Sequence, residues 1–192
     1  MKLLDLLRSL LPADGATDND LRRIEAAAAP HQLGKGERLP IGSGVAGALV
    51  TTGCLRAYFV EPDGAQRVLY FAPAGWWIPG SARRAAVAGP GTTIEALEPS
   101  EVWTIEQATL TSAPAFEHVR TALAERTLRA LQQRLVGAMR KTAAERYYEF
   151  QRLYPGLDAR ISQYHIAEYL GVSPEFLSRL RTRLLRESHA VS

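Results

Sequence analysis

The residues with the clearest capacity for chemistry lie in a short stretch near the C-terminus, SPEFLSRLRTRLLR, which starts at Ser173. Written as a helix, this stretch places Glu175, Ser178 and Arg179 on one face. Carboxylate, hydroxyl and guanidinium groups can hydrogen-bond the base edges in the major groove of DNA. Side chains further along the same helix are suited to phosphate contacts, namely Arg181, Thr182, Arg183 and Arg186. The pattern predicts a helix that reads double-stranded DNA.

The residues around this helix predict how it is held. Ser173 is a good N-cap, and Pro174 fits the first helical position, where its missing N–H leaves no hydrogen bond unmade. A preceding helix is expected to start after Ser162 and to end at Gly171, which can adopt the left-handed conformation. Inward-facing side chains are expected at Ile166, Ala167 and Leu170 in the first helix and at Leu177, Leu180 and Leu184 in the second.

This order of small residue, glycine turn and apolar anchors is the spacing of a DNA-binding helix-turn-helix, here from Gln163 to Leu185. An ordinary corner between two helices would explain the glycine and the leucines. It would not explain the polar and basic side chains on the opposite face, so the segment favours DNA binding.

Upstream of Pro114 the chain is rich in turns. Twelve of the 15 glycines and nine of the 11 prolines lie at or before this residue. Period-2 runs at 55–60 and 68–72, on either side of the turn at 61–64, predict a hairpin. The runs at 92–97 and 101–105, around the turn at 98–100, predict a second pair of strands. Short strands with frequent turns indicate a β-sandwich or barrel.

Two helices are expected before these strands, at 2–11 and at 18–29. Thr17 or Asp18 can cap the second helix, and Pro30 can stop it.

After Pro114 the pattern becomes helical, and residues 115–141 contain no proline and one glycine. A line of apolar side chains in this predicted helix repeats at spacings of 4, 3, 4 and 3, which is the a/d pattern of a coiled coil: Ala124, Leu128, Leu131, Leu135 and Ala138. The line predicts a homodimer interface. One face lying on the β-domain would give the same spacing, and a long helix can do both. A further helix is expected at 143–154, ended by Pro155 and Gly156.

The composition, with 46% hydrophobic and 22% charged residues, is that of an ordinary globular protein. The leucine-rich opening at 1–11 is interrupted by Asp5 and Arg8 and is too short for a secretory signal, so we expect a cytoplasmic protein. The net charge of +3 is unevenly spread, since residues 1–114 carry −2 and residues 115–192 carry +5. This asymmetry indicates that the C-terminal part meets a polyanion, although surplus arginines can also solubilise a helical surface.

The single cysteine, Cys54, excludes an intrachain disulfide and any cysteine-only metal or iron–sulfur site within one chain. We expect it to be an inert thiol. The four histidines, His31, His118, His165 and His189, have no metal-binding spacing, and neither a Walker glycine loop nor a G-x-S-x-G motif is present. We therefore expect no metal site and no enzyme activity.

The order of N-terminal helices, glycine-rich strands, long helix and helix-turn-helix resembles the catabolite-activator and anaerobic-regulator (Crp/Fnr) superfamily over nearly the whole chain. The stretch ISQYHIAEYLGVSPEFLSRLRTRLL is similar to that family's recognition motif. In the motif a serine, a glutamate two residues on and an arginine four further on open the second helix, here Ser173, Glu175 and Arg179. The resemblance implies that Glu175 and Arg179 contact base edges and that Ser178 joins them.

Two features depart from the family pattern. Pro174 replaces the arginine that is common at its position, which removes one contact. Only six residues follow Arg186, so we expect no β-hairpin wing.

Family members that bind cyclic AMP hold its phosphate with a glycine–glutamate pair and, further on, an adjacent arginine and serine or threonine. A buried phosphate requires such an arginine because an unpaired anion will not leave water. The corresponding stretches here are GWWI at 75–78 and GPGTT at 89–93. Neither contains the phosphate-binding arginine, and Arg83 and Arg84 are the arginines that could replace it. Cyclic AMP is therefore not the expected effector, and no other cofactor is expected. A small-molecule effector would lie near Gly75, Trp76, Trp77, Thr92 and Thr93, although tryptophans in strands more often fill the core.

These observations predict an α+β protein with a jelly-roll-like, cyclic-nucleotide-binding-like β-roll domain at 1–114, a dimerisation helix at 115–141 and a helix-turn-helix DNA-binding domain at 142–192. The predicted function is that of a homodimeric, sequence-specific transcription regulator that binds an inverted repeat, with RNA polymerase as a further partner and no membrane association. The alternative is a ligand-binding β-roll module whose C-terminal helices bind a protein partner. Such a module would be expected to lose the basic run and the Glu-x-x-Ser-Arg pattern, and both are present.

Overall fold

The computed structural model describes residues 2–10, 16–42, 44–80, 91–111 and 114–190. Two helices come first, α1 (Leu3–Leu10) and α2 (Asp18–Ala27). Thr17 caps α2, because its hydroxyl accepts from the Asp20 N–H at 3.3 Å while the Asp20 carboxylate accepts from the Thr17 N–H at 3.1 Å. The helix ends two residues before the predicted boundary, because the chain continues directly as strand β1 (Ala28–Leu33). Pro30 is tolerated there because β1 is an edge strand.

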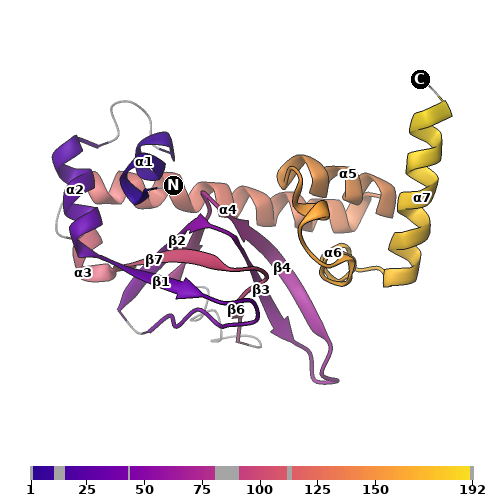
Figure 1. Cartoon of the computed structure of the whole chain (residues 1–192), viewed down its shortest axis with the longest axis horizontal. Coiled ribbons are helices and arrows are strands. Elements are labelled where there is room, and N and C mark those ends of the chain that lie inside the picture. The colour runs from indigo at the N-terminus through magenta and orange to yellow at the C-terminus, as the bar shows by residue number, and fades with distance from the viewer. Residues whose placement is uncertain (1, 11–15, 43, 81–90, 112–113, 191–192) are drawn as a thin grey trace.

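The other strands are β2 (Val45–Thr52), β3 (Cys54–Val60), β4 (Gln66–Pro73), β5 (Trp77–Pro79), β6 (Thr93–Ala96) and β7 (Ser100–Glu106). They form two antiparallel sheets with the orders β1-β7-β2-β5 and β4-β3-β6. The sheets make up a β-roll that is followed by helices, which confirms the predicted α+β class (Figure 1).

The hairpin predicted at 55–60 and 68–72 is confirmed as β3 and β4. The second predicted pair, 92–97 with 101–105, is wrong as a pair. Strand β6 bonds to β3, whereas β7 bonds to β1 and β2, so the turn at 98–100 is a corner where the chain crosses between sheets. Alternation of apolar residues determines which face of a strand is buried but not which strand lies beside it.

A second corner, at Gly53, lies against the first. Gly53 has a φ of 81°, and a Cβ at this position would lie 2.2 Å from Ser100 Oγ, so only glycine fits. Ser100 Oγ donates to the Glu98 carbonyl at 2.7 Å and accepts from the Cys54 N–H at 3.2 Å, which ties the two corners together. Burial raises the pKa of the Cys54 thiol to about 12, as expected for an inert cysteine.

The helices that follow are α3 (Gln107–Thr111), α4 (Pro114–Arg140), α5 (Ala143–Leu153), α6 (Gln163–Leu170) and α7 (Pro174–Ala190), with a 3-10 turn, η2 (Leu157–Ala159), before α6. Helix α4 runs along the length of the molecule, past the sheets and up to the C-terminal helices (Figure 1). The predicted helices at 115–141 and 143–154 are confirmed to within one residue at each end. No helix in the part of the chain described above is both long and apolar enough to span a bilayer.

One hydrophobic core joins the sheets to the C-terminal helices. The ring of Phe71 on β4 lies 5.4 to 5.8 Å from the rings of Phe150, Tyr154 and Tyr169, which come from α5, its C-cap and α6. Trp76 lies 5.3 Å from Tyr154 in the same cluster. The division of the chain at 114 and 141 stays a prediction, but the shared core means that the helix-turn-helix is docked on the β-roll.

Candidate nucleic-acid interface

The turn between α6 and α7 has the predicted geometry. Ser162 Oγ accepts from the Tyr164 N–H at 3.3 Å and so caps α6. Gly171 is left-handed, with φ of 68°, and the Val172 N–H donates to the Ala167 carbonyl at 3.0 Å. Ser173 then caps α7 by accepting from the Phe176 N–H at 3.2 Å. The sequence pattern therefore predicted both caps and the turn residue correctly.

The apolar anchors of the two helices are buried as predicted. Ala167 of α6 is 1% exposed, and its small side chain suits a close crossing of two helices. Leu177 and Leu180 are also buried, and Leu184 packs against the same core. This packing fixes the rotation of α7 about its own axis.

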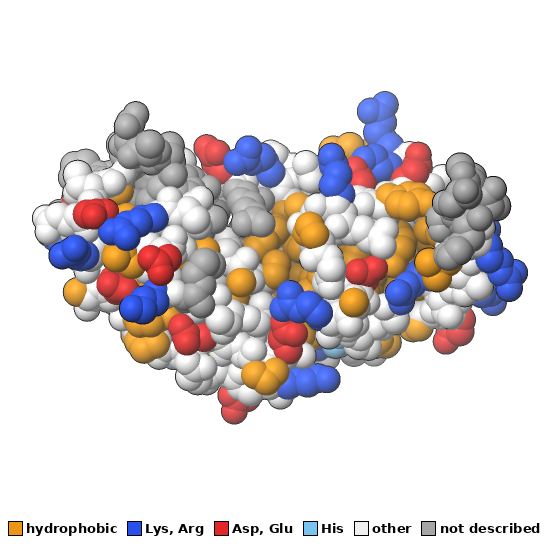
Figure 2. Space-filling model, turned by 45° about the horizontal axis from the view of Figure 1, so that its top comes forward, with side chains coloured by type: hydrophobic (Ala, Val, Ile, Leu, Met, Phe, Trp, Pro, Cys, Tyr) orange, Lys and Arg blue, Asp and Glu red, His pale blue; other side chains and the backbone are white. Residues whose placement is uncertain are grey.

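The opposite face of α7 is exposed, and it carries most of the residues predicted to meet DNA: Ser173, Glu175, Ser178, Arg179, Thr182, Arg183 and Arg186. Figure 2 shows basic side chains at the end of the molecule where α7 lies. Hydrogen bonds from the Glu175 N–H and from Ser173 lower the pKa of the Glu175 carboxyl, so this side chain is a carboxylate at neutral pH and can only accept hydrogen bonds.

Arg181 differs from the rest of the predicted set because it is half-buried. It faces Tyr147 of α5 and Asp158 of the η2 turn. Burial opposes ionisation of Asp158, but hydrogen bonds from Gln151 and Tyr147, together with the charge of Arg181, lower the pKa of its carboxyl. Arg181 thus has a partner in the protein whether or not it also meets phosphate.

Phe176 is a surface residue that the sequence pattern did not single out. Its ring is 42% exposed in the first turn of α7, beside the polar face. An aromatic residue next to Leu177 in an amphipathic helix would usually be assigned to the core. The only sequence signal of its exposure is that Phe176 lies outside the stripe formed by the buried leucines of α7.

A buried charged cluster attaches α6 to the β-roll. Arg56 of β3 is 4% exposed and lies 3.3 Å from Glu168 Oε2 and 3.0 Å from Glu95 Oε1. Its Nη1 also lies 2.9 Å from His165 Nδ1. The same Nδ1 lies 3.1 Å from Glu168 Oε2, so this nitrogen is placed between a guanidinium, which can only donate, and a carboxylate, which can only accept. Burial lowers the pKa of His165. No spacing in the sequence relates His165 to Arg56 and Glu168, so the cluster was not predicted.

The residues predicted to form a dimer interface divide between two faces of α4. Leu128 and Leu135 are 55% and 65% exposed, and Met139 and Val136 extend this apolar surface. Leu131 instead packs against the main core and Ala124 against the core beneath α1 and α2, while the side chain of Ala138 lies outside the described part. The helix therefore both covers the β-roll and presents an apolar face, and Figure 2 shows hydrophobic side chains gathered near the middle of the molecule.

Two of the residues predicted to hold an effector are core residues. Trp76 and Trp77 are buried in two different clusters, as core tryptophans are. Thr93 pairs with Tyr58 across the sheet. Arg83 and Arg84 lie outside the described residues. Within the described residues, no group of three or more His, Cys, Asp or Glu side chains is arranged to hold a metal.

The sequence matches no protein-family model and no curated protein. Solved structures do match. FixK2 from Bradyrhizobium japonicum is 23% identical, with coverage of 84% of this chain and 86% of that chain and a TM-score of 0.67. A CooA mutant from Carboxydothermus hydrogenoformans is 18% identical, with coverage of 97% and 85% and a TM-score of 0.68. A protein from Eubacterium rectale, described as a transcriptional regulator of the Crp/Fnr family, is 18% identical, with coverage of 93% and 88% and a TM-score of 0.66.

Proposed function

From the premise that the chain has the fold of the Crp/Fnr transcription regulators, we propose that it binds double-stranded DNA sequence-specifically and regulates transcription. The observation that carries the proposal is the two-faced character of α7. Leu177 and Leu180 anchor the helix, while Glu175, Ser178 and Arg179 are exposed on its first two turns. The N-terminus of α7 then enters the major groove, as in other helix-turn-helix proteins.

Each exposed group on these turns has a suitable partner in DNA. Arg179 can donate two hydrogen bonds to guanine, and the Glu175 carboxylate can accept from the amino group of cytosine. Ser178 can donate or accept. Thr182, Arg183 and Arg186 lie further along the helix and contact phosphates, which adds affinity but little discrimination. The proposal assigns no catalytic step to the chain.

The exposed apolar face of α4 supports a homodimer. Leu128, Leu135 and Met139 would be covered by the same residues of a second copy, in the manner of a coiled coil. A two-fold dimer binds an inverted repeat whose half-sites are about 10 bp apart, so that both copies of α7 meet the same side of the duplex. RNA polymerase bound nearby would be the further partner of such a regulator.

The test begins with selection of bound sequences from random duplex DNA. Binding is then titrated on the selected site and on a scrambled duplex at two salt concentrations. Arg179→Ala should weaken binding to the selected site by about 1 to 3 kcal/mol and leave the scrambled duplex nearly unaffected. Arg186→Ala should weaken both duplexes alike and reduce the salt dependence.

Arg152→Ala is the matched control, because this arginine of α5 is 73% exposed and belongs neither to the assigned reading face nor to the assigned phosphate contacts. It should change neither affinity. Equal losses on both duplexes for Arg179→Ala would make Arg179 a phosphate contact and would contradict the assigned reading face.

A further inference from the structure

An exposed aromatic ring lies beside the reading face of α7, and none of the contacts assigned above uses it. Phe176 is 42% exposed, whereas its neighbour Leu177 is buried. Within the described residues, the Phe176 ring is part of neither the main core nor the core beneath α1 and α2. An apolar ring gains free energy when it leaves water, so this ring favours an apolar contact with a partner.

The first turn of α7 fixes where this ring lies. The Phe176 N–H donates to the Ser173 hydroxyl at 3.2 Å, which is the cap of the helix. Side chains of a helix lean toward its N-terminus. The Phe176 ring therefore covers the end of α7 that the proposed function places in the major groove.

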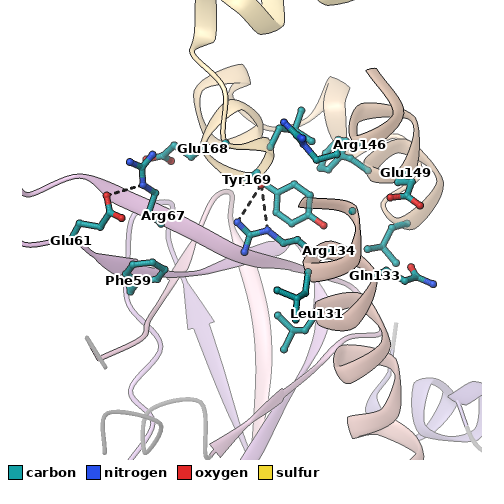
Figure 3. Close-up of a pocket in the computed structure, with 16 residues that line it drawn as sticks. Phe59, Glu61, Arg67, Leu131, Gln133, Arg134, Arg146, Glu149, Glu168 and Tyr169 are labelled. Carbon is teal, nitrogen blue, oxygen red and sulfur yellow. Dashed lines mark hydrogen bonds and ion pairs between the residues drawn. The ribbon is translucent and has the colours of Figure 1, made fainter. Parts of the chain in front are cut away.

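The helix-turn-helix is in turn held by its neighbours. Arg134 of α4 donates from Nε and from Nη2 to the Tyr169 carbonyl of α6, both at 3.3 Å (Figure 3). Its Nη1 donates to the Leu69 carbonyl of β4 at 3.1 Å. Leu177 joins α7 to the same core as α6. The outward position of the Phe176 ring is thus a property of the docked helix-turn-helix.

Phe176 begins a line of exposed residues that continues through Arg179 and Arg183. Spacings of three and then four residues place these side chains one above another on the same face of a helix. The proposed function assigns Arg179 to a base edge and Arg183, further along, to a phosphate. Phe176 lies closer than Arg179 to the N-terminus that enters the groove. Its ring therefore lies at the depth of the base edges and not at that of the phosphates.

The base edges offer one group that suits an apolar ring. Adenine, guanine and cytosine present hydrogen-bond donors and acceptors in the major groove, and thymine also presents its C5 methyl group. A phenyl ring would take water from the donors and acceptors without replacing its hydrogen bonds. The same ring gains free energy by covering a methyl group.

We propose that Phe176 recognises a thymine in each half-site by covering its methyl group, at a base pair next to the guanine that Arg179 contacts. This inference rests on the proposed function, because it uses the same helix in the same groove. It adds a methyl contact to the hydrogen bonds of Glu175 and Arg179. The recognised sequence is then longer than those two side chains alone would give.

The experiment uses the full chain and its selected DNA site. Each thymine of one half-site is replaced in turn with deoxyuridine, which lacks the methyl group and keeps every hydrogen-bonding atom of thymine. At a thymine next to the guanine, the replacement should weaken wild-type binding by about threefold to fivefold, the effect of one methyl group that is no longer covered. Phe176→Ala should bind the thymine and uracil sites equally, and Phe176→Leu should keep part of the preference.

Tyr148→Ala is the matched control, because this aromatic residue of α5 is 54% exposed and belongs to none of the assigned contacts. It should keep the full preference for thymine. Thermal unfolding of Phe176→Ala should stay close to that of the wild type, because the ring is exposed. Loss of the thymine preference in a folded Phe176→Ala then reports the contact with DNA.

The outcomes separate this inference from the proposed function. A chain that selects no DNA sequence would overturn both. A selected site that depends on Arg179 but has no thymine next to the guanine, or tolerates uracil there, would overturn only the role of Phe176. An equal effect of uracil on the wild type and Phe176→Ala would overturn it too, because another group would then cover the methyl. Equal losses of Phe176→Ala on the selected and scrambled duplexes would place the ring on the sugar–phosphate backbone, against the proposal.

Discussion

At the scale of single residues, the strongest constraint is the buried charge of Arg56. Its side chain is 5% exposed, and both Glu95 and Glu168 depend on it as their ion-pair partner. Tyr58 donates to the second oxygen of Glu95 at 3.1 Å, and its ring lies 4.2 Å from the guanidinium. One residue of β3 thereby connects β6 to the first helix of the helix-turn-helix.

Arg56→Leu should be severely destabilising, because it leaves two carboxylates in a buried site without their cation. We expect the free energy of unfolding to fall by about 3 to 5 kcal/mol, measured by urea denaturation. Arg67→Leu on the same hairpin is the matched control, because its pair with Glu61 is exposed and worth about 1 kcal/mol or less. Equal effects of the two changes would show that the Arg56 cluster contributes no more than a surface ion pair.

His165 gives this cluster a defined pH dependence. Burial lowers its pKa below the ordinary value of 6.5, so the unfolded chain takes up the proton first. The stability that His165 contributes is therefore complete above pH 6.5 and is lost as the pH falls from 6.5 through the folded pKa.

The free energy of unfolding should thus decrease more steeply for the wild type than for His165→Asn between about pH 7 and about pH 5. The other three histidines are common to both proteins, so the difference between the two curves reports His165. If the free energy of unfolding changed with pH equally in both proteins, the attraction of Glu168 would fully offset the cost of burying the protonated His165 ring.

At the scale of elements, α4 performs two tasks with two faces. Thr127 and Ala130 are buried against the chain's own β-roll, and Thr127 donates to the Trp77 carbonyl at 2.8 Å. Leu128 and Leu135 lie on the other side and are exposed. The two faces can therefore be separated by mutation.

Leu135→Asp should yield a folded protein that sediments as a monomer, because the change places a charge on the proposed interface and leaves the core intact. Leu131→Asp should lower the melting temperature as well, because Leu131 packs against the core. Sedimentation and thermal unfolding, measured on both variants, distinguish the two faces. A wild-type protein that is monomeric at micromolar concentration would contradict the proposed dimer.

Elements with a strong local signal could be predicted from the sequence, and the others could not. The caps and the left-handed glycine of the helix-turn-helix are local, so α6 and α7 were predicted closely. Strand β5 has only three residues, and β1 carries Pro30 without clear alternation. Strand β2 is buried without a break from Gly47 to Thr51, and a Cβ at Gly47 would lie 2.1 Å from the Trp77 ring. The sequence of β2 therefore lacks the alternation of apolar and polar residues by which a strand is predicted.

The residues of the candidate site could likewise be predicted only in part. The exposed face of α7 follows from helical periodicity, which the sequence contains. The pairing of Arg56 with Glu168 and the contacts of Arg134 with Leu69 join residues far apart in the chain, and they exist only because the β-roll and the helices dock. No spacing rule relates such residues before the fold is known.

At the scale of the whole molecule, the important property is the attachment of the helix-turn-helix to the β-roll. The aromatic cluster around Phe71, the Arg56 cluster and the carbonyl contacts of Arg134 all cross this boundary. Arg160 adds an ion pair with Glu98 at the corner between the sheets. Helix α7 extends from the end of the molecule that is distant from α1 and α2 (Figure 1).

In a dimer whose two copies of α4 pack together, the docking of each helix-turn-helix on its β-roll would fix the distance between the two copies of α7. Binding to DNA with altered spacing between the half-sites tests this expectation. Insertion of about 5 bp turns one half-site to the opposite side of the duplex, and insertion of about 10 bp restores the side but moves the half-site by about 34 Å. If the docking persists on DNA, both insertions should reduce affinity to that of a single half-site, measured by titration at constant salt. Helix-turn-helix units that moved freely on a flexible connection would tolerate the 10 bp insertion much better than the 5 bp insertion. Full affinity for the 10 bp insertion would therefore mean that α6 leaves the β-roll when the protein binds its site.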